Sequence, residues 1–264
     1  MSETSDIISP AVVRRLLRAN IPARVMQLSI SGPHAYGYAH DNSPIELKGI
    51  HVEPTERIVG LVRPPRAINW IGEFEGYRID YSSLEIEAAL NQLLKGDGSM
   101  NERILATGQL LPGDDLTQIR RLVKAAISKR IHGHYRKFAM GVMRDYEDGE
   151  KRTVRHLLGA YRTALTGAHL LRTGELELNL SELAKRYGFA KLDSLIAICH
   201  KKDRAYLEEK SPWINRMVKL HGLLEESAEI SELPRDPVNP TLVEDFLLDI
   251  RRRFFDAPTV QEDI

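Results

Sequence analysis

The sequence predicts an α+β protein in which an α/β half is followed by an all-helical half. Strand-like apolar segments separated by Gly-rich turns lie in the first half, whereas from Asp114 onward apolar residues recur at helical spacing. The composition shifts between the two patterns from Gly108 to Asp115. A chain of 264 residues can bury a substantial core in two modest domains. We therefore expect domains at residues 1–110 and 111–264.

The first half is expected to combine strands with short helices. Apolar residues at helical spacing predict a helix over residues 10–20. Ser82, followed three residues later by Glu85, has the form of a capping box, so we expect a helix from there to about residue 95. A shorter helix is expected at residues 100–106. Strands are predicted at residues 25–31, 45–52, 67–73 and 77–81.

The second half is expected to contain helices alone, each bounded by Gly, Pro, Ser or Asp. The predicted ranges are residues 114–127, 129–146, 150–173, 180–187, 192–209, 212–226 and 240–254.

The composition is that of a soluble protein without the net positive charge that would attract nucleic acid. Lys plus Arg and Asp plus Glu are both 37, so attraction to a polyanion would need a local patch. No apolar run is long enough to span a bilayer, and we do not expect the polar N-terminal residues to act as a signal peptide. The single cysteine, Cys199, cannot form an internal disulfide and lies in an apolar run where we expect it to be buried. We therefore expect a cytoplasmic protein without a membrane partner.

One motif stands out between the first two predicted strands. Gly32-Pro-His-Ala-Tyr-Gly37 is followed after seven residues by a strand that contains Lys48-Gly-Ile. Glycines at both ends of such a turn let backbone N–H groups approach an anion, as in a phosphate cradle. The pattern resembles the predicted nucleotidyltransferases of the DNA polymerase beta superfamily that are found beside RNA-repair genes. In that family the turn reads Gly-Ser-x-Ala-Tyr-Gly, and the next strand opens with Asp-x-Asp.

The resemblance implies a nucleotidyltransferase-type short mixed sheet with flanking helices, followed by the all-helical domain. It also implies that an NTP lies on the Gly-rich turn and that carboxylates on adjacent strands hold Mg²⁺, which neutralises the reacting phosphates. Glu46 stands where the family has its second Asp, and Asp80 matches its third carboxylate. The first Asp is replaced by Pro44, which has no ligand atom, and the Ser of the turn is replaced by Pro33, which has neither a hydroxyl nor a backbone N–H.

Glu46 and Asp80 are therefore the candidate catalytic residues and metal ligands. Equally simple structural interpretations exist for both: Glu46 as an exposed strand residue paired with Lys48 or Arg78, and Asp80 as a residue that helps to cap the next segment. The candidate nucleotide-binding residues are Gly32, Pro33, Gly37, Lys48, Arg78 and Arg162, of which the three cations would stabilise phosphate charge.

A basic stretch follows the predicted boundary. Eight basic residues and no acidic one occur from Thr117 to Arg144. Phosphate backbones attract such clusters through counterion release, although a solvated helical face is the alternative interpretation. His132, His134 and Tyr135, interspersed in the stretch, are candidates for stacking on bases. The candidate nucleic-acid-binding residues are Arg120, Lys124, Arg130, Arg136 and Lys137.

Three functions are compatible with the sequence. The first is an active, Mg²⁺-dependent nucleotidyltransferase that acts on RNA through Glu46 and Asp80. The second is a nucleotidyltransferase-like protein that binds NTP, RNA or tRNA but is weakly active or inactive, in other words a pseudoenzyme. The third is a structural subunit of an RNA-repair or similar complex, held by a protein partner. The missing carboxylate at position 44 favours the second and third functions over the first, and the basic stretch favours the second over the third.

Overall fold

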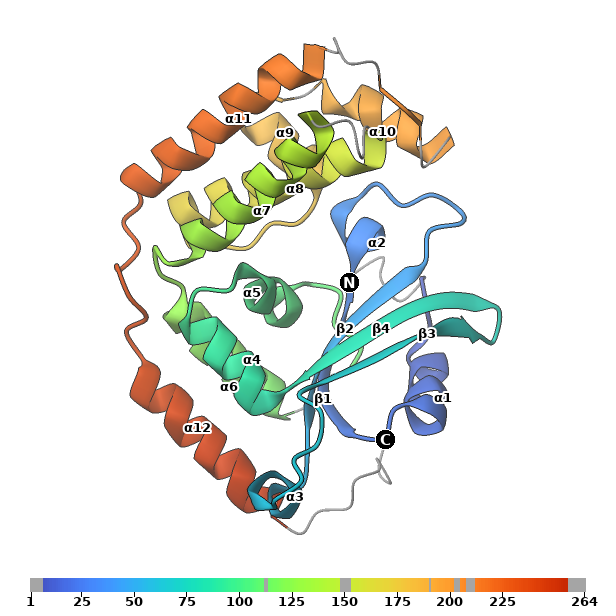
Figure 1. The fold of residues 1–264 in the computed structure, drawn as a ribbon, viewed down its shortest axis with the longest axis vertical. Helices are drawn as coiled ribbons and strands as arrows, with labels where there is room; N and C mark the ends of the chain where they lie inside the picture. Colours follow the sequence, from blue (N-terminus) through green and yellow to red (C-terminus); the bar gives the residue numbers. More distant parts are fainter. Residues whose placement is uncertain are drawn as a thin grey trace.

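A four-stranded mixed sheet forms the centre of the computed structural model, which describes residues 7–111, 114–147, 153–189, 191–201, 205–207 and 212–255 (Figure 1). The strand order is β1-β2-β4-β3. β1 is antiparallel to β2, β2 is parallel to β4, and β4 is antiparallel to β3. The strands are β1 Arg24–Ser31, β2 Ile45–Val52, β3 Ala67–Phe74 and β4 Tyr77–Glu85. The predicted short mixed sheet is therefore confirmed.

Two local predictions in the first half were wrong. Ser82 does not begin a helix, because β4 continues through Glu85, with Ser83 and Glu85 buried and paired in register with β2. The helix begins at Ile86, and the Glu85 side chain accepts the backbone N–H of Glu87. The stretch predicted as a Gly-rich turn folds as a short helix, α2 Gly32–Tyr36, which Gly37 ends in the left-handed conformation.

The two faces of the sheet bury different partners. Leu47, Ile79 and Tyr81 pack with helix α1 in one apolar cluster. The opposite face carries Ser29 and Lys48 and is covered by α4, α5 and α6 (Figure 1). Strand alternation accounts for this division, because successive side chains leave opposite faces. One face is thus filled by apolar packing, and the other carries polar side chains as well as the covering helices.

The helices agree well with the predicted ranges. α10 ends at Lys201, earlier than predicted, and residues 202–204 and 208–209 of the predicted helix lie outside the described part of the chain. The helices are α1 Pro10–Asn20, α2 Gly32–Tyr36, α3 Thr55–Val59, α4 Ile86–Leu94, α5 Gly98–Leu105, α6 Asp114–Ala126, α7 Ile131–Glu147, α8 Val154–Thr173, α9 Leu180–Arg186, α10 Leu192–Lys201, α11 Pro212–Glu229 and α12 Pro240–Arg253.

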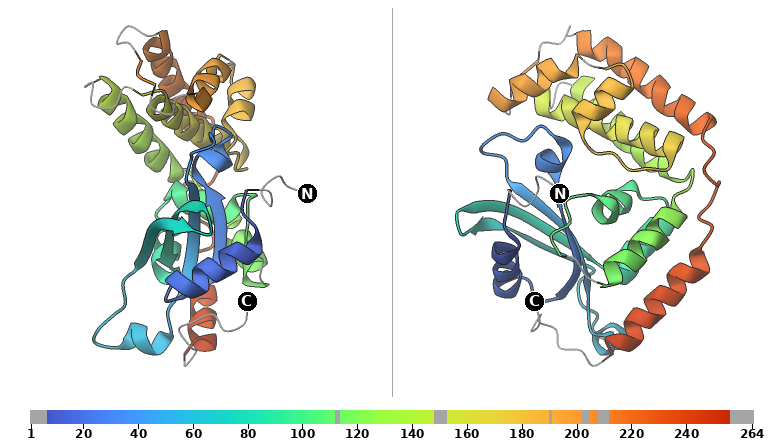
Figure 2. Two further views of the ribbon diagram at one scale, coloured as in Figure 1. Left: turned by 90° about the vertical axis from the view of Figure 1, so that its right-hand side faces the viewer. Right: turned by 180° about the vertical axis from the view of Figure 1, so that it is seen from behind.

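Helix α8 is the axis of the second half. It packs against α7, α9, α10 and α11, and most of its residues are buried. These helices gather at one end of the molecule, beyond α2 (Figures 1 and 2). Cys199 is buried in α10, as predicted. In the described part of the chain, no helix is long and apolar enough to cross a membrane.

The last helix returns to the first half of the chain. α12 lies against α4 and α6, at the end of the molecule opposite to α7–α11 (Figure 2). Arg251 of α12 forms an ion pair with Glu85 at 2.7 Å, and Thr55 donates a hydrogen bond to the Arg251 carbonyl at 2.7 Å. Both side chains of this ion pair are buried, so they fix the end of α12 beside β4. The predicted domain boundary between residues 110 and 111 stays a prediction. α12 belongs to the predicted second domain, but it packs against α4 of the first.

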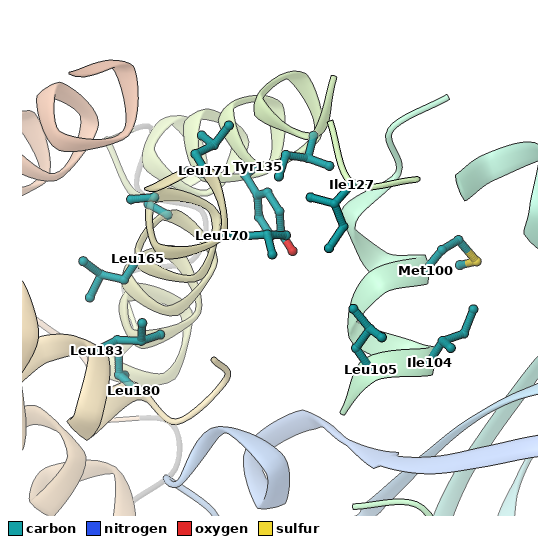
Figure 3. Close-up of a cluster of buried hydrophobic side chains, with 14 of the residues drawn as sticks. Met100, Ile104, Leu105, Ile127, Tyr135, Leu165, Leu170, Leu171, Leu180 and Leu183 are labelled. Carbon is teal, nitrogen blue, oxygen red and sulfur yellow. The ribbon is translucent and has the colours of Figure 1, made fainter. Parts of the chain in front are cut away.

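Tyr135 joins the two halves within the core. It is fully buried, and Figure 3 shows it among apolar side chains of α5, α8 and the segment that precedes α7. Gly98 of α5 and Gly167 of α8 both lie directly against its ring, and a Cβ on either glycine would overlap it. Glycine lets α5 and α8 approach α7 this closely.

We predict that Gly167→Ala destabilises the protein although it lies inside a helix. Alanine in place of a helical glycine normally stabilises by up to about 1 kcal/mol. At Gly167 the new Cβ would lie 2.5 Å from Cγ of the buried Tyr135, and overpacking costs about 1–3 kcal/mol. The measurement is the free energy of unfolding in urea.

The matched control is Gly159→Ala in the same helix, where a new Cβ meets no atom within 4 Å. This variant should be as stable as the wild type or more stable. If Gly167→Ala were stabilising too, Tyr135 would not be packed as described.

Candidate functional site

Three polar residues lie in a row across the sheet. Ser31 of β1 is the register partner of Glu46, and Glu46 is the register partner of Asp80 on the parallel strand β4. Register partners project from the same face of a sheet. The two candidate carboxylates are therefore neighbours on one face, as the sequence predicted.

Gly32 brings α2 directly against Glu46. Its φ is +65°, which L-residues with a side chain rarely adopt, and a Cβ built on it would overlap the Glu46 carboxylate. Both constraints require glycine. The motif glycine thus lets the chain turn from β1 into α2 while leaving space for the carboxylate of β2.

Two adjoining cavities open between the sheet and the second half of the chain. They have volumes of about 390 and 580 Å³ and share Tyr36, Glu46, Phe138 and Arg162 in their walls. We call them the first and second cavities, and together the cleft. β2 and α2 form one side of the cleft, and α7 and α8 form the other.

A buried ion pair lies at the boundary between the two cavities. Arg162 of α8 donates a hydrogen bond from Nη1 to Oε1 of Glu102 on α5 at 2.6 Å, and the two side chains are only 10% and 12% exposed. The Arg162 guanidinium also lies over the Tyr36 ring, 4.1 Å from its centroid. Burial opposes the charge on Arg162, but Glu102 and the surrounding tyrosines hold its pKa above its usual value.

Two further cations line the first cavity. Arg103 donates hydrogen bonds to the carbonyls of Gly49, at 2.6 Å, and Ser82, at 3.1 Å. Burial lowers the pKa of Arg103 to about 10, so the guanidinium is still charged at neutral pH. Lys48 is the second cation, and its ammonium is 4.0 Å from the Asp80 carboxylate.

The cleft contains some of the predicted nucleotide-binding residues and not others. Lys48 and Arg162 line the first cavity, and Pro33 and Arg162 line the second. Arg78 lines neither cavity; it is exposed and donates to the Asn42 carbonyl at 3.3 Å. Gly37 lies against Asn179 on another side of α2. Asp80 is outside the lining of both cavities, although it adjoins Lys48.

The carboxylates in the described part of the chain do not complete a metal centre held by protein alone. There, no group of three His, Cys, Asp or Glu side chains is placed to hold a metal ion. Glu46 and Asp80 are neighbours, but Asp80 has an ammonium beside it, and Pro44 offers no ligand atom. This donor set does not fit a two-metal site of the family type.

The predicted basic stretch is largely paired with acids from distant segments. Arg120 donates to the carbonyl of Leu105 at 3.1 Å. Lys124 pairs with Glu175 at 3.1 Å, Arg130 with Asp236 at 2.7 Å, and Arg136 with Glu225 at 3.0 Å. Lys137 is exposed on α7. None of these five cations lines either cavity, so the structure does not bring them to the cleft.

Several residues of the cleft were not selected from the sequence. Glu102 and Arg103 lie in a helix that the sequence predicted without assigning it a function. Phe138 belongs to the same run as His134 and Tyr135, but the expectation that Tyr135 is free to stack was wrong, because its ring is fully buried. His134 does reach the first cavity, where its Nδ1 lies 3.2 Å from the Asp97 carboxylate. The sequence did contain a signal for Phe138: it lies four residues after His134, and residues at this spacing share one face of a helix.

A mixed sheet with acidic residues on adjacent parallel strands, beside a short helix bounded by glycines, is the arrangement expected of nucleotidyltransferases of the DNA polymerase beta superfamily. A sequence model described as the RNA repair pathway DNA polymerase beta family matches residues 10–249, and the chain belongs to that family. The resemblance found in the sequence is thereby confirmed.

The comparisons with individual proteins are more remote. Among solved structures, a nucleotidyltransferase-like protein from Exiguobacterium sibiricum is similar to this chain at 12% identity, over 92% of this chain and 80% of that one, with a TM-score of 0.33. We draw no structural or functional conclusion from a similarity this low. No curated protein matches the sequence.

We predict that Arg162→Met strongly destabilises the fold. It leaves the buried Glu102 carboxylate without its partner, and breaking a buried pair in this way costs about 3–5 kcal/mol. The double variant Arg162→Met, Glu102→Leu should recover most of the loss, because no unpaired charge remains. The measurement is the free energy of unfolding at neutral pH.

Lys124→Met is the matched control, because it removes an ion pair whose side chains are 52% and 66% exposed. Its cost should be below about 1 kcal/mol. Equal losses in Arg162→Met and Lys124→Met would contradict the view that the Arg162 pair organises the cleft.

Proposed function

We propose that the protein binds a nucleoside triphosphate in the cleft between β2 and helices α7 and α8, and that it is weakly active or inactive as a nucleotidyltransferase. The observation that carries this proposal is the wall of the first cavity. Lys48, Arg103 and Arg162 bring three positive charges to a cavity that also contains the carboxylates of Glu46 and Glu102. Charge-assisted hydrogen bonds from such cations are the usual means of holding phosphate.

The expectation of low activity rests on the altered centre of the family motif. Pro44 removes one metal ligand, and Pro33 removes a hydroxyl and a backbone donor from the start of α2. The Lys48 ammonium lies beside Asp80 and partly neutralises the negative charge that would attract a metal ion. We therefore assign no reaction step to a bound metal ion.

An active, Mg²⁺-dependent enzyme is the second candidate. The register pairing of Glu46 with Asp80 favours it, because these carboxylates are adjacent on one face. Mg²⁺ often needs only one or two carboxylates when phosphate oxygens and water complete its coordination. A nucleotide in the cleft could supply those oxygens, and transfer to an RNA hydroxyl would then be the reaction.

RNA remains a candidate partner with weaker support than the nucleotide. A phosphate of RNA that approached Lys124, Arg130 or Arg136 would have to displace or share a carboxylate that is already within 3.1 Å. This pairing lowers the local potential that would attract a polyanion.

We predict that wild-type protein binds ATP, but transfers little or no labelled nucleotide to RNA in the presence of Mg²⁺. Binding is measured by calorimetry. Lys48→Met should raise the Kd for ATP about 10-fold, because it removes one charge-assisted contact. The matched control is Lys191→Met, which removes an exposed lysine outside both cavities.

The transfer assay separates the candidates. A Pro33→Ser, Pro44→Asp double variant should recover activity only in part. Robust turnover by the wild type that Glu46→Ala abolishes would establish the active enzyme instead. Failure of the wild type to bind either ATP or RNA would leave the structural subunit of a complex as the function.

A further inference from the structure

The two cavities of the cleft share a wall, but their other lining residues differ. The first is lined by polar and charged groups, among them Lys48, Arg103 and Ser99. The second adds Pro33, Tyr38 and Val142, which offer apolar surface, together with the polar side chains of Thr153, Arg155 and His156. A nucleotide also has two unlike ends, with an anionic phosphate chain at one end and a flat, largely apolar base at the other.

Phe138 is the aromatic side chain that faces this space. It lines both cavities and is 52% exposed, whereas Tyr36 is covered by Arg162 and Tyr38 is 5% exposed. An exposed phenylalanine at the mouth of a cleft leaves its ring face in water, and a stacked base would remove that face from water. The side chain is therefore available to a ligand without displacing another protein group described here.

The position of Phe138 on α7 directs it to the cleft. His134, Phe138 and Val142 are spaced by four residues, so they lie on one face of the helix, and each lines at least one of the cavities. The adjoining face of α7 packs into the core through Tyr135 and Ala139. Core packing thus sets the rotation of α7 and holds Phe138 opposite Glu46.

We propose that Phe138 forms a stacking platform for the nucleobase in the second cavity, while the phosphates enter the first cavity toward Lys48 and Arg103. This inference rests on the proposed function and adds a base subsite to it. Arg162 lies between the two subsites, within reach of the ribose or of the phosphate nearest to it. Stacking on an aromatic ring tolerates any base, so the subsite selects nucleotides over simple phosphates rather than one base over another.

The test compares ATP with inorganic tripolyphosphate, which has the phosphate chain but no base. Phe138→Ala should raise the Kd for ATP about 10-fold and leave the Kd for tripolyphosphate unchanged, since only the stacked base is lost. Phe138→Trp should retain ATP binding. Calorimetry measures these affinities, and an unchanged melting temperature shows that the alanine variant is folded.

Phe255→Ala is the matched control, because Phe255 is also an exposed aromatic residue, at 50%, and lines neither cavity. It should bind both ligands as the wild type does. If the wild type binds ATP and Phe138→Ala binds it equally well, the base subsite is refuted and the proposed function stands. If Phe138→Ala lost affinity for ATP and for tripolyphosphate equally, the base subsite would also be refuted. A wild type that binds neither ligand overturns both the subsite and the proposed function.

Discussion

The cleft depends on one buried ion pair, between Arg162 and Glu102. The guanidinium and the carboxylate are each about nine-tenths buried, so separating them would leave unpaired buried charges at a large cost in free energy. The elements that carry them must therefore stay together. These elements are α8 and α5, and the Tyr36 ring over the guanidinium adds α2. The second half of the chain is thereby held over the same face of the sheet that carries Glu46. The separation between the sheet and α8, and so the space left for a ligand, follows from this pair.

The packing of Tyr135 and the position of Gly32 extend the same constraint. Gly98 and Gly167 lack a Cβ and so leave space for the Tyr135 ring. This lets α5 and α8 pack closely against α7. Gly32 likewise lets α2 approach the Glu46 carboxylate. The cleft walls are thus positioned by close contacts at glycines and by a charge pair, while the chemistry at its centre differs from the family pattern through Pro33 and Pro44.

Local patterns predicted the strands and most helices because alternation and helical spacing are short-range signals. The same short range explains the errors. Ser82 to Glu85 has the form of a capping box, but pairing with two neighbouring strands overrides it. The basic stretch contains no acid in sequence, yet Glu175, Glu225 and Asp236 reach it through the fold. Glu46 could be found from a motif, whereas the role of Glu102 could not, because its partner Arg162 is 60 residues away.

The proposed nucleotide site is the cleft between Glu46 and Arg162. The most direct measurement is a crystal structure of the protein with a non-hydrolysable ATP analogue. We expect the analogue to contact residues of β2 on one side and of α7 and α8 on the other, with the Arg162–Glu102 pair intact. An analogue bound elsewhere on the molecule, with the cleft filled only by water, would contradict it.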